Sequence, residues 1–325
     1  MRAIVNSGPN RLEMLQLPQP QPGPGQVRIR TGACAICATD LLMFPGWERT
    51  DFPTIPGHEW SGMVEAVGAG VDSGWIGQRC VAENMLPGGE VGFEFPGGYG
   101  EFFLTEAANL YRLPDGFPFT TAALIEPLSV CLRAFKRLHL EGRPRVLILG
   151  DGPIGLLNLL LMRYAGVEKV FVVGGRSHRL QLAEELGAWK TLNFQTITDD
   201  FTAGVIRTAG QPFPVIIEAS GSSLAVQASV QLVATCGKIL VLGDYGKARA
   251  NFEWNHLLHQ QIEIIGSNAG AGVWEEAVRL AVEGAIPLQR LITHTFPVDR
   301  FAEAIALAQS QREDFVKIVL EWEPS

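Results

Sequence analysis

The sequence has few cysteines, no basic cluster and no apolar run long enough to cross a bilayer. Its five cysteines are odd in number and scattered, which predicts a reducing cytoplasm rather than a disulfide framework. Lysine and arginine total 26 against 34 aspartate and glutamate residues, a net charge of −8. We therefore expect neither nucleic acid nor an anionic membrane as a partner.

The N-terminus also lacks the pattern of a signal peptide, because the short stretch Met1–Asn6 runs directly into Ser7-Gly8-Pro9. The 325 residues exceed the usual size of a single hydrophobic core, so we expect two domains. A composition of 47% hydrophobic and 18% charged residues is typical of a globular enzyme.

One glycine motif organises the chain. The aliphatic stretch Val146–Leu149 leads into Gly150-Asp151-Gly152-Pro153-Ile154-Gly155, and a helical run follows. A strand, G-x-G-x-x-G and a helix form the context of a dinucleotide-binding turn, which a chance glycine match would lack. Gly150 permits the tight turn, Gly152 lets a pyrophosphate approach the backbone, and Gly155 lets the helix pack on its strand. We assign the whole turn, including Pro153 and Ile154, to a cofactor site.

The chain alternates strands and helices over residues 127–267, which predicts a Rossmann-type doubly wound parallel sheet. Strands are expected at Arg145–Leu149, Lys169–Val173, Val215–Glu218, Lys238–Leu242 and Ile262–Ile265, and helices at Arg179–Leu186 and Ser223–Val233. Residues 1–126 instead show short alternating runs typical of a β-rich domain. Residues 268–325, with helices at Trp274–Glu283 and Asp299–Gln309 and a strand at Phe315–Leu320, are expected to complete this first domain.

Two side chains in the first domain are candidate zinc ligands. Cys37 follows a predicted strand, and His58 lies in a Pro/Gly turn about twenty residues later. Zinc prefers sulfur and nitrogen donors, and a catalytic zinc keeps one position open for water or substrate. Taken singly, however, a cysteine is often core filler and a histidine often structural. Cys34 and Cys37 form a C-x-x-C pair, but no second pair completes a structural zinc site.

The sequence resembles the medium-chain zinc-dependent alcohol dehydrogenases, and it does so over residues 1–320. The landmarks are Cys37-Ala38-Thr39-Asp40, Pro56-Gly57-His58-Glu59, Gly77-Gln78-Arg79 and Glu126-Pro127-Leu128-Ser129-Val130, the last being similar to polyol (sorbitol-like) and threonine dehydrogenases. The resemblance implies an α/β fold: a GroES-like β-rich catalytic domain interrupted by the Rossmann domain, with the active site in the cleft between them.

The same resemblance implies that Cys37, His58 and Glu126 hold a catalytic zinc, with Glu59 able to bind the metal or its water. Glu126 could instead be a helix-start residue, and Glu59 a surface charge. Two departures from the family matter. Residues 82–98 contain no cysteine, so we expect one zinc and no structural zinc. Leu42 stands where the relay histidine usually lies; Thr39 can still pass a proton, or could serve as a helix N-cap.

Nucleotide choice depends on the end of the second Rossmann strand, where an NAD enzyme places an acid. This chain has Gly174-Gly175-Arg176 there, which favours the 2′-phosphate of NADP, although NAD stays possible. Arg176 could also be a solvated charge, and Asp151 tempers the preference. Ala219, Gly243 and Ser267 complete the expected cofactor site.

We therefore predict a zinc-dependent, NADP-preferring alcohol dehydrogenase that reversibly oxidises a secondary or polyol hydroxyl to a carbonyl, as a homodimer or homotetramer. Two alternatives share the scaffold: a catalytically silent nucleotide-binding protein and a zinc-free quinone reductase. Cys37, His58 and Glu126 together argue against both, because a metal-free site does not need them.

Overall fold

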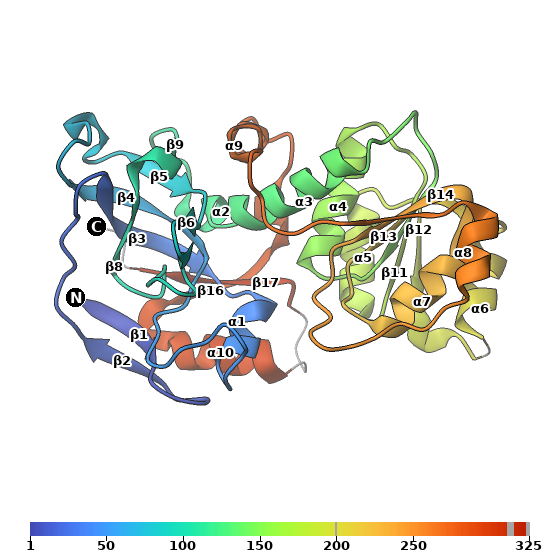
Figure 1. The fold of residues 1–325 in the computed structure, drawn as a ribbon, viewed down its shortest axis with the longest axis horizontal. Coiled ribbons are helices and arrows are strands. Elements are labelled where there is room, and N and C mark those ends of the chain that lie inside the picture. The colour runs from blue at the N-terminus through green and yellow to red at the C-terminus, as the bar shows by residue number, and fades with distance from the viewer. Residues whose placement is uncertain (199, 311–314, 323–325) are drawn as a thin grey trace. The chain divides into compact units, whose positions relative to one another are not determined.

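The computed structural model describes residues 1–198, 200–310 and 315–322. The chain packs into two compact units, Met1–Glu126 with Ala271–Ser325, and Pro127–Gly270 (Figure 1). Among the described residues, no helix combines the length and the apolar character that a transmembrane span requires.

The first unit is built on a mostly antiparallel sheet with the strand order β16-β17-β3-β4-β5-β9, and β8 pairs with β3 off this path. These strands are β3 (Gln26–Ala35), β4 (Glu59–Val67), β5 (Arg79–Ala82), β8 (Phe102–Glu106), β9 (Leu110–Arg112), β16 (Ile292–Pro297) and β17 (Lys317–Glu321). Two small hairpins accompany the sheet: β1 (Arg2–Asn6) with β2 (Leu12–Gln16), and β6 (Met85–Leu86) with β7 (Gly89–Glu90).

The C-terminal segment completes the sheet that the N-terminal segment begins. β17 pairs antiparallel to β3, with Val319 opposite Ala35, and β16 pairs parallel to β17. This unit also contains α1 (Ala38–Met43), α2 (Phe119–Ala122), α9 (Trp274–Val282) and α10 (Phe301–Ser310). Buried side chains such as Ile29, Phe103 and Leu320 form one core beneath the strands. The core therefore joins residues from both ends of the chain.

The second unit is a six-stranded parallel sheet with the order β12-β11-β10-β13-β14-β15. The strands are β10 (Val146–Leu149), β11 (Val170–Gly174), β12 (Lys190–Asn193), β13 (Phe213–Glu218), β14 (Val233–Val241) and β15 (Glu263–Gly266). The helices are α4 (Pro153–Tyr164), α5 (Ser177–Glu185), α6 (Phe201–Ala209), α7 (Ser223–Leu232) and α8 (Trp254–Gln260), while α3 (Ile125–Arg137) begins in the first unit. The predicted doubly wound sheet is confirmed, with the order reversing at β10.

Two boundaries differ from the predicted ones in ways that bear on the site. β14 begins at Val233, five residues before the expected start, because the chain enters the sheet through an irregular stretch in which Cys236 has a left-handed φ of 58°. β11 extends to Gly174, which places that glycine at the end of the strand rather than in the following loop.

Candidate active site

Cys37 stands at the junction of a strand and a short helix. β3 ends at Ala35 and α1 begins at Ala38, so Cys37 is the N-cap residue. Its backbone N–H donates to Oδ2 of Asp40 at 2.8 Å, which anchors the first turn of the helix. Its thiol donates to Oγ1 of Thr39 at 3.6 Å. Thr39 itself is the second residue of α1, so the alternative of Thr39 as the N-cap is wrong.

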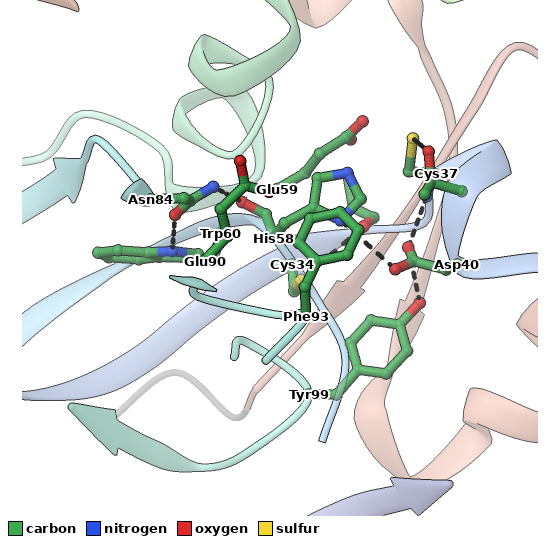
Figure 2. A network of polar contacts seen from close by, with 12 residues as sticks. Cys34, Cys37, Asp40, His58, Glu59, Trp60, Asn84, Glu90, Phe93 and Tyr99 are labelled. Carbon is green, nitrogen blue, oxygen red and sulfur yellow. Dashed lines mark hydrogen bonds and ion pairs between the residues drawn. The ribbon is translucent and has the colours of Figure 1, made fainter. Parts of the chain in front are cut away.

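His58 is positioned by a glycine turn and by a buried acid. Gly57 has φ +100°, and a Cβ there would lie 2.6 Å from the Tyr99 ring, so the turn requires glycine. Nδ1 of His58 lies 3.5 Å from Oδ1 of Asp40, and the Tyr99 hydroxyl donates to Oδ2 of Asp40 (Figure 2). A carboxylate facing one ring nitrogen leaves the other nitrogen for a metal.

The charge on His58 depends on its neighbours. Burial disfavours the imidazolium, but the neighbouring Cys37 and Asp40 side chains outweigh it and raise the pKa of His58 well above its usual value. A site that draws positive charge between a sulfur and a carboxylate suits a cation in the same position.

The ligand atoms of Cys37, His58 and Glu59 all lie within 4.8 Å of one another. Ligands about 2.0–2.3 Å from a tetrahedral zinc are roughly 3.5 Å apart, so small side-chain movements bring these atoms onto one ion. Two of these groups also face charged neighbours, because His58 Nδ1 lies 3.5 Å from Asp40 and Glu59 Oε2 lies 2.5 Å from the Lys317 ammonium. Sulfur, nitrogen and oxygen donors together fit zinc. Throughout the part of the chain that the structure describes, this is the one such group of three.

Glu59 is the first residue of β4 and is paired with a lysine from β17. The Lys317 ammonium lies 2.7 Å from Oε1 and 2.5 Å from Oε2 of Glu59, and only 2% of Glu59 is exposed. The alternative of Glu59 as a surface charge is therefore wrong. Burial alone would lower the pKa of Lys317, but the Glu59 carboxylate outweighs burial and raises it, which favours the charged ammonium.

Glu126 is the second residue of α3 and its carboxyl is electrostatically coupled to the cluster. Burial is the main cause that raises its pKa, the Glu59 carboxylate adds to the rise, the positive charge of His58 opposes it, and the net result is a pKa of about 7. The three ligand atoms within 4.8 Å do not include Glu126. A carboxyl with a pKa near 7 beside two metal-ligand candidates would release its proton to solvent when a cation binds there.

An aromatic and cationic stack covers His58. The centroids of the Phe93 and His58 rings are 4.7 Å apart. The Arg49 guanidinium lies 4.5 Å from the Phe93 centroid and 5.8 Å from the Trp47 centroid. Arg49 also pairs with Glu90 at 3.1 Å and with Glu94 at 2.8 Å. The stack gives the site an apolar wall, and its arginine is already neutralised by two carboxylates.

The glycine turn of the second unit has the shape of a pyrophosphate cradle. Gly150 has φ +122°, and a Cβ there would lie 2.9 Å from the Ala219 backbone. A Cβ on Gly155 would lie 2.0 Å from the Gly150 carbonyl oxygen, so helix and strand approach as closely as predicted. Near Gly152, in contrast, a Cβ would meet only Nη1 of Arg179, at 3.9 Å. The open space and the start of α4 fit a phosphate group.

The other predicted cofactor residues follow the carboxyl ends of neighbouring parallel strands. Ala219 follows β13, Gly243 lies two residues beyond β14, and Ser267 follows β15. The carboxyl ends of parallel strands share one edge of a sheet, which is where nucleotides bind in such folds. Ser267 also has a buried hydroxyl without a hydrogen-bond partner.

Sequence reasoning missed several contributors to both sites. The sequence motif contains Asp40 but gives it no role, and Lys317 carries no local signal because it lies 258 residues from Glu59. Arg179 showed no pattern that would point to Gly152. Cys34 is fully buried in β3, where its thiol donates to the Ala35 carbonyl, so the C-x-x-C pair is no metal knuckle.

Comparisons with known proteins agree with this geometry. Residues 23–115 match the alcohol dehydrogenase GroES-like domain, and residues 153–283 match the zinc-binding dehydrogenase family. The chain is 30% identical over 342 residues to a sorbitol dehydrogenase of Gallus gallus, covering 98% of this chain and 95% of that protein. It is 28% identical over 340 residues to a D-arabitol-phosphate dehydrogenase of Enterococcus avium, covering 98% and 96%.

A solved structure extends the likeness to three dimensions. The 2R,3R-butanediol dehydrogenase of Bacillus subtilis superposes with a TM-score of 0.87 at 25% identity, covering 99% of each chain. The predicted fold class, a GroES-like domain with a Rossmann domain, is thereby confirmed.

Proposed function

Because this chain belongs to the medium-chain zinc-dependent dehydrogenase family, oxidoreductases that act on alcohols or polyols with NAD(P), we propose that it oxidises a neutral secondary or polyol hydroxyl at Cys37 and His58. The observation that carries this proposal is the convergence of Cys37, His58 and Glu59, from separate segments, within 4.8 Å. A silent nucleotide-binding protein or a metal-free quinone reductase has no use for such a group.

Glu126 is the proposed third zinc ligand. Glu59 is proposed to lie beside the metal site without binding the ion directly. Lys317 contacts both oxygens of Glu59, which satisfies that carboxylate without a metal. Glu126 has a pKa of about 7, which the positive charge of His58 already lowers, so a bound cation would favour its ionised form. When bound, zinc supplies Lewis acidity that lowers the pKa of the alcohol, and NAD(P) supplies the hydride acceptor. One zinc per chain is proposed, because residues 82–98 offer no cysteine for a structural site.

Thr39 is the proposed proton acceptor. Its hydroxyl receives a hydrogen bond from the Cys37 thiol, so it lies at the same site as the metal-ligand candidates. A hydroxyl that can accept one proton and donate another can pass the alcohol proton onward. Leu42 is 44% exposed and cannot continue the relay, so we assign the exit to water.

The substrate is proposed to be uncharged. Arg49 is the cation that stacks with Phe93 over His58, and Glu90 and Glu94 already neutralise it. A phosphorylated polyol would meet two carboxylates beside that arginine, and their repulsion disfavours a phosphate. The apolar faces of Phe93 and Trp47 instead suit the carbon skeleton of a secondary alcohol or diol.

NADP is the proposed preferred nucleotide, with NAD as a second cofactor. β11 ends in Gly174 without an acid, and Arg176 follows two residues later. A guanidinium recognises a 2′-phosphate well. The carboxylate of Asp151, which accepts hydrogen bonds from the backbone of Gly175 and Arg176, works against this preference.

A homodimer or homotetramer is proposed on the basis of one sheet edge in the second unit. β15 is an edge strand, and Ile264 on it is 42% exposed. Trp254 and Leu258, on the preceding helix α8, are 74% and 66% exposed. An open apolar edge of this kind favours pairing with another chain.

The direct test is an oxidation screen with zinc-loaded protein, using NADP and NAD against neutral polyols, simple secondary alcohols, amino alcohols and polyol phosphates. We expect turnover with the neutral alcohols and little with the phosphates. Cys37→Ser is the matched variant: it should lose turnover while its nucleotide titration is nearly unchanged. Equal turnover by Cys37→Ser would refute the proposed site.

A further inference from the structure

Asp151 reaches out of the glycine turn to the end of the neighbouring strand. Its Oδ2 accepts hydrogen bonds from the backbone N–H groups of Gly175 and Arg176, each at 2.8 Å. Asp151 is only 9% exposed. The carboxylate therefore occupies two donors at the carboxyl end of β11, where the adenine ribose of a dinucleotide is recognised.

The side chain of Asp151 fills the space that a side chain on Gly174 would need. A Cβ built on Gly174 would lie 2.3 Å from Oδ2, 2.4 Å from Cβ and 2.5 Å from Cγ of Asp151. Gly174 is the last residue of β11, the position at which NAD enzymes carry their ribose-binding acid. The chain thus lacks an acid on the strand but has a carboxylate from the adjacent turn in the same place.

We infer that Asp151 is a specificity-determining residue that replaces the missing strand-end acid, favouring the ribose hydroxyls of NAD and opposing the 2′-phosphate of NADP. The inference rests on the proposed dehydrogenase function. A 2′-phosphate needs donors and positive charge, but the N–H groups of Gly175 and Arg176 are already bonded to an anion. A phosphate there would meet the Asp151 carboxylate at short range, and such like-charge contacts are costly.

Asp151 and Arg176 act in opposite directions on the same choice. The Arg176 guanidinium attracts the 2′-phosphate, whereas the Asp151 carboxylate repels it. This opposition limits the NADP preference and keeps NAD usable. Removing either charge should therefore move the preference in a defined and opposite direction.

The test is calorimetric titration of the full-length, zinc-loaded protein with 2′,5′-ADP and with 5′-ADP, which differ only in the phosphate concerned. In Asp151→Asn we expect the ratio of the two Kd values to shift toward 2′,5′-ADP by about tenfold or more. Glu168→Gln is the matched control, because it removes one exposed negative charge just before β11, at the other end of the strand. Its ratio should match that of the wild type.

A second variant moves the carboxylate back to the strand. Asp151→Gly combined with Gly174→Asp places the acid at the end of β11 and vacates the space that its Cβ requires. We expect this double variant to regain the wild-type ratio that Asp151→Asn loses. If Asp151→Asn does not fold, the double variant alone tests the inference. A double variant that favours 2′,5′-ADP about tenfold more than the wild type would overturn it.

The outcomes separate this inference from the proposed function. If both probes bind and Asp151→Asn leaves their ratio within twofold of the wild type, Asp151 does not set the choice. If the folded wild-type protein binds neither probe, the dehydrogenase proposal fails and the inference fails with it. Retained binding with a shifted ratio supports both.

Discussion

The ammonium group of Lys317 lies 2.7 Å from Oε1 and 2.5 Å from Oε2 of Glu59, and the two side chains are only 4% and 2% exposed. Lys317 begins β17, and Glu59 begins β4. Glu59 directly follows His58, so this buried pair links the C-terminal strand to the proposed metal site. The lysine neutralises a carboxylate that would otherwise compete for the cation.

Lys317→Met should destabilise the first unit, because it leaves the Glu59 carboxylate buried without its partner. Breaking a buried ion pair from one side costs about 3–5 kcal/mol. The matched variant Lys317→Met with Glu59→Gln removes both charges and should recover most of the loss. Urea unfolding of zinc-loaded protein measures the difference, and a single variant as stable as the wild type would contradict the ionised pair.

Glu126→Gln should weaken zinc binding far more than Glu59→Gln does. An amide oxygen carries no charge, so replacing an inner ligand is expected to lower zinc affinity by more than replacing a residue that Lys317 already neutralises. Losses of about 10–100-fold are typical for residues that support a ligand, and a larger loss marks the ligand itself. Competition with a chelator measures both. A greater loss in Glu59→Gln would exchange the two assignments.

The purified protein should contain one zinc per chain. The proposed site uses Cys37 and His58, and residues 82–98 have no cysteine for a second ion. Elemental analysis of an undamaged preparation should give a ratio near one, and Cys37→Ser should bring it close to zero. Two ions per wild-type chain would show that a second site exists.

The Rossmann unit could be predicted from sequence because its signals are local. The turn from Gly150 to Gly155 and the uniformly apolar strand before it lie within ten residues, and that strand pairs parallel to β11 and β13 as the prediction requires. The ends of elements carry weaker local signals. The predicted start of β14 missed Val233, since pairing with Phe213 rather than an alternating pattern fixes that end.

The site in the first unit depended on contacts that no local pattern carries. Only the resemblance to the dehydrogenase family predicts Cys37 and His58 as zinc ligands, because a single cysteine or histidine is usually structural. The pairing of Glu59 with Lys317 and the hydrogen bonds of Asp151 to the backbone at Gly175 arise from tertiary packing. Side chains that meet backbone groups of another strand leave no sequence signature.

Ile264→Lys should disrupt assembly. Ile264 lies on the edge strand β15, and a lysine on an exposed edge opposes strand pairing with another chain. Light scattering after size-exclusion chromatography should show a dimer or tetramer for the wild type and a smaller species for the variant. Ile76→Lys is the control, since Ile76 is 51% exposed in the first unit. A wild-type monomer would remove the proposed assembly.

Thr39→Val should lower kcat while leaving zinc content and nucleotide affinity unchanged. Valine keeps the shape of threonine but removes the hydroxyl that receives the Cys37 thiol hydrogen bond and, in our proposal, the alcohol proton. Loss of a positioned proton-transfer group typically costs about 10²–10⁴-fold in rate. Thr39→Ser retains the hydroxyl and should keep most of the activity, which separates proton transfer from packing in α1. A valine variant as fast as the serine variant would show that the alcohol proton leaves by a route that does not use Thr39.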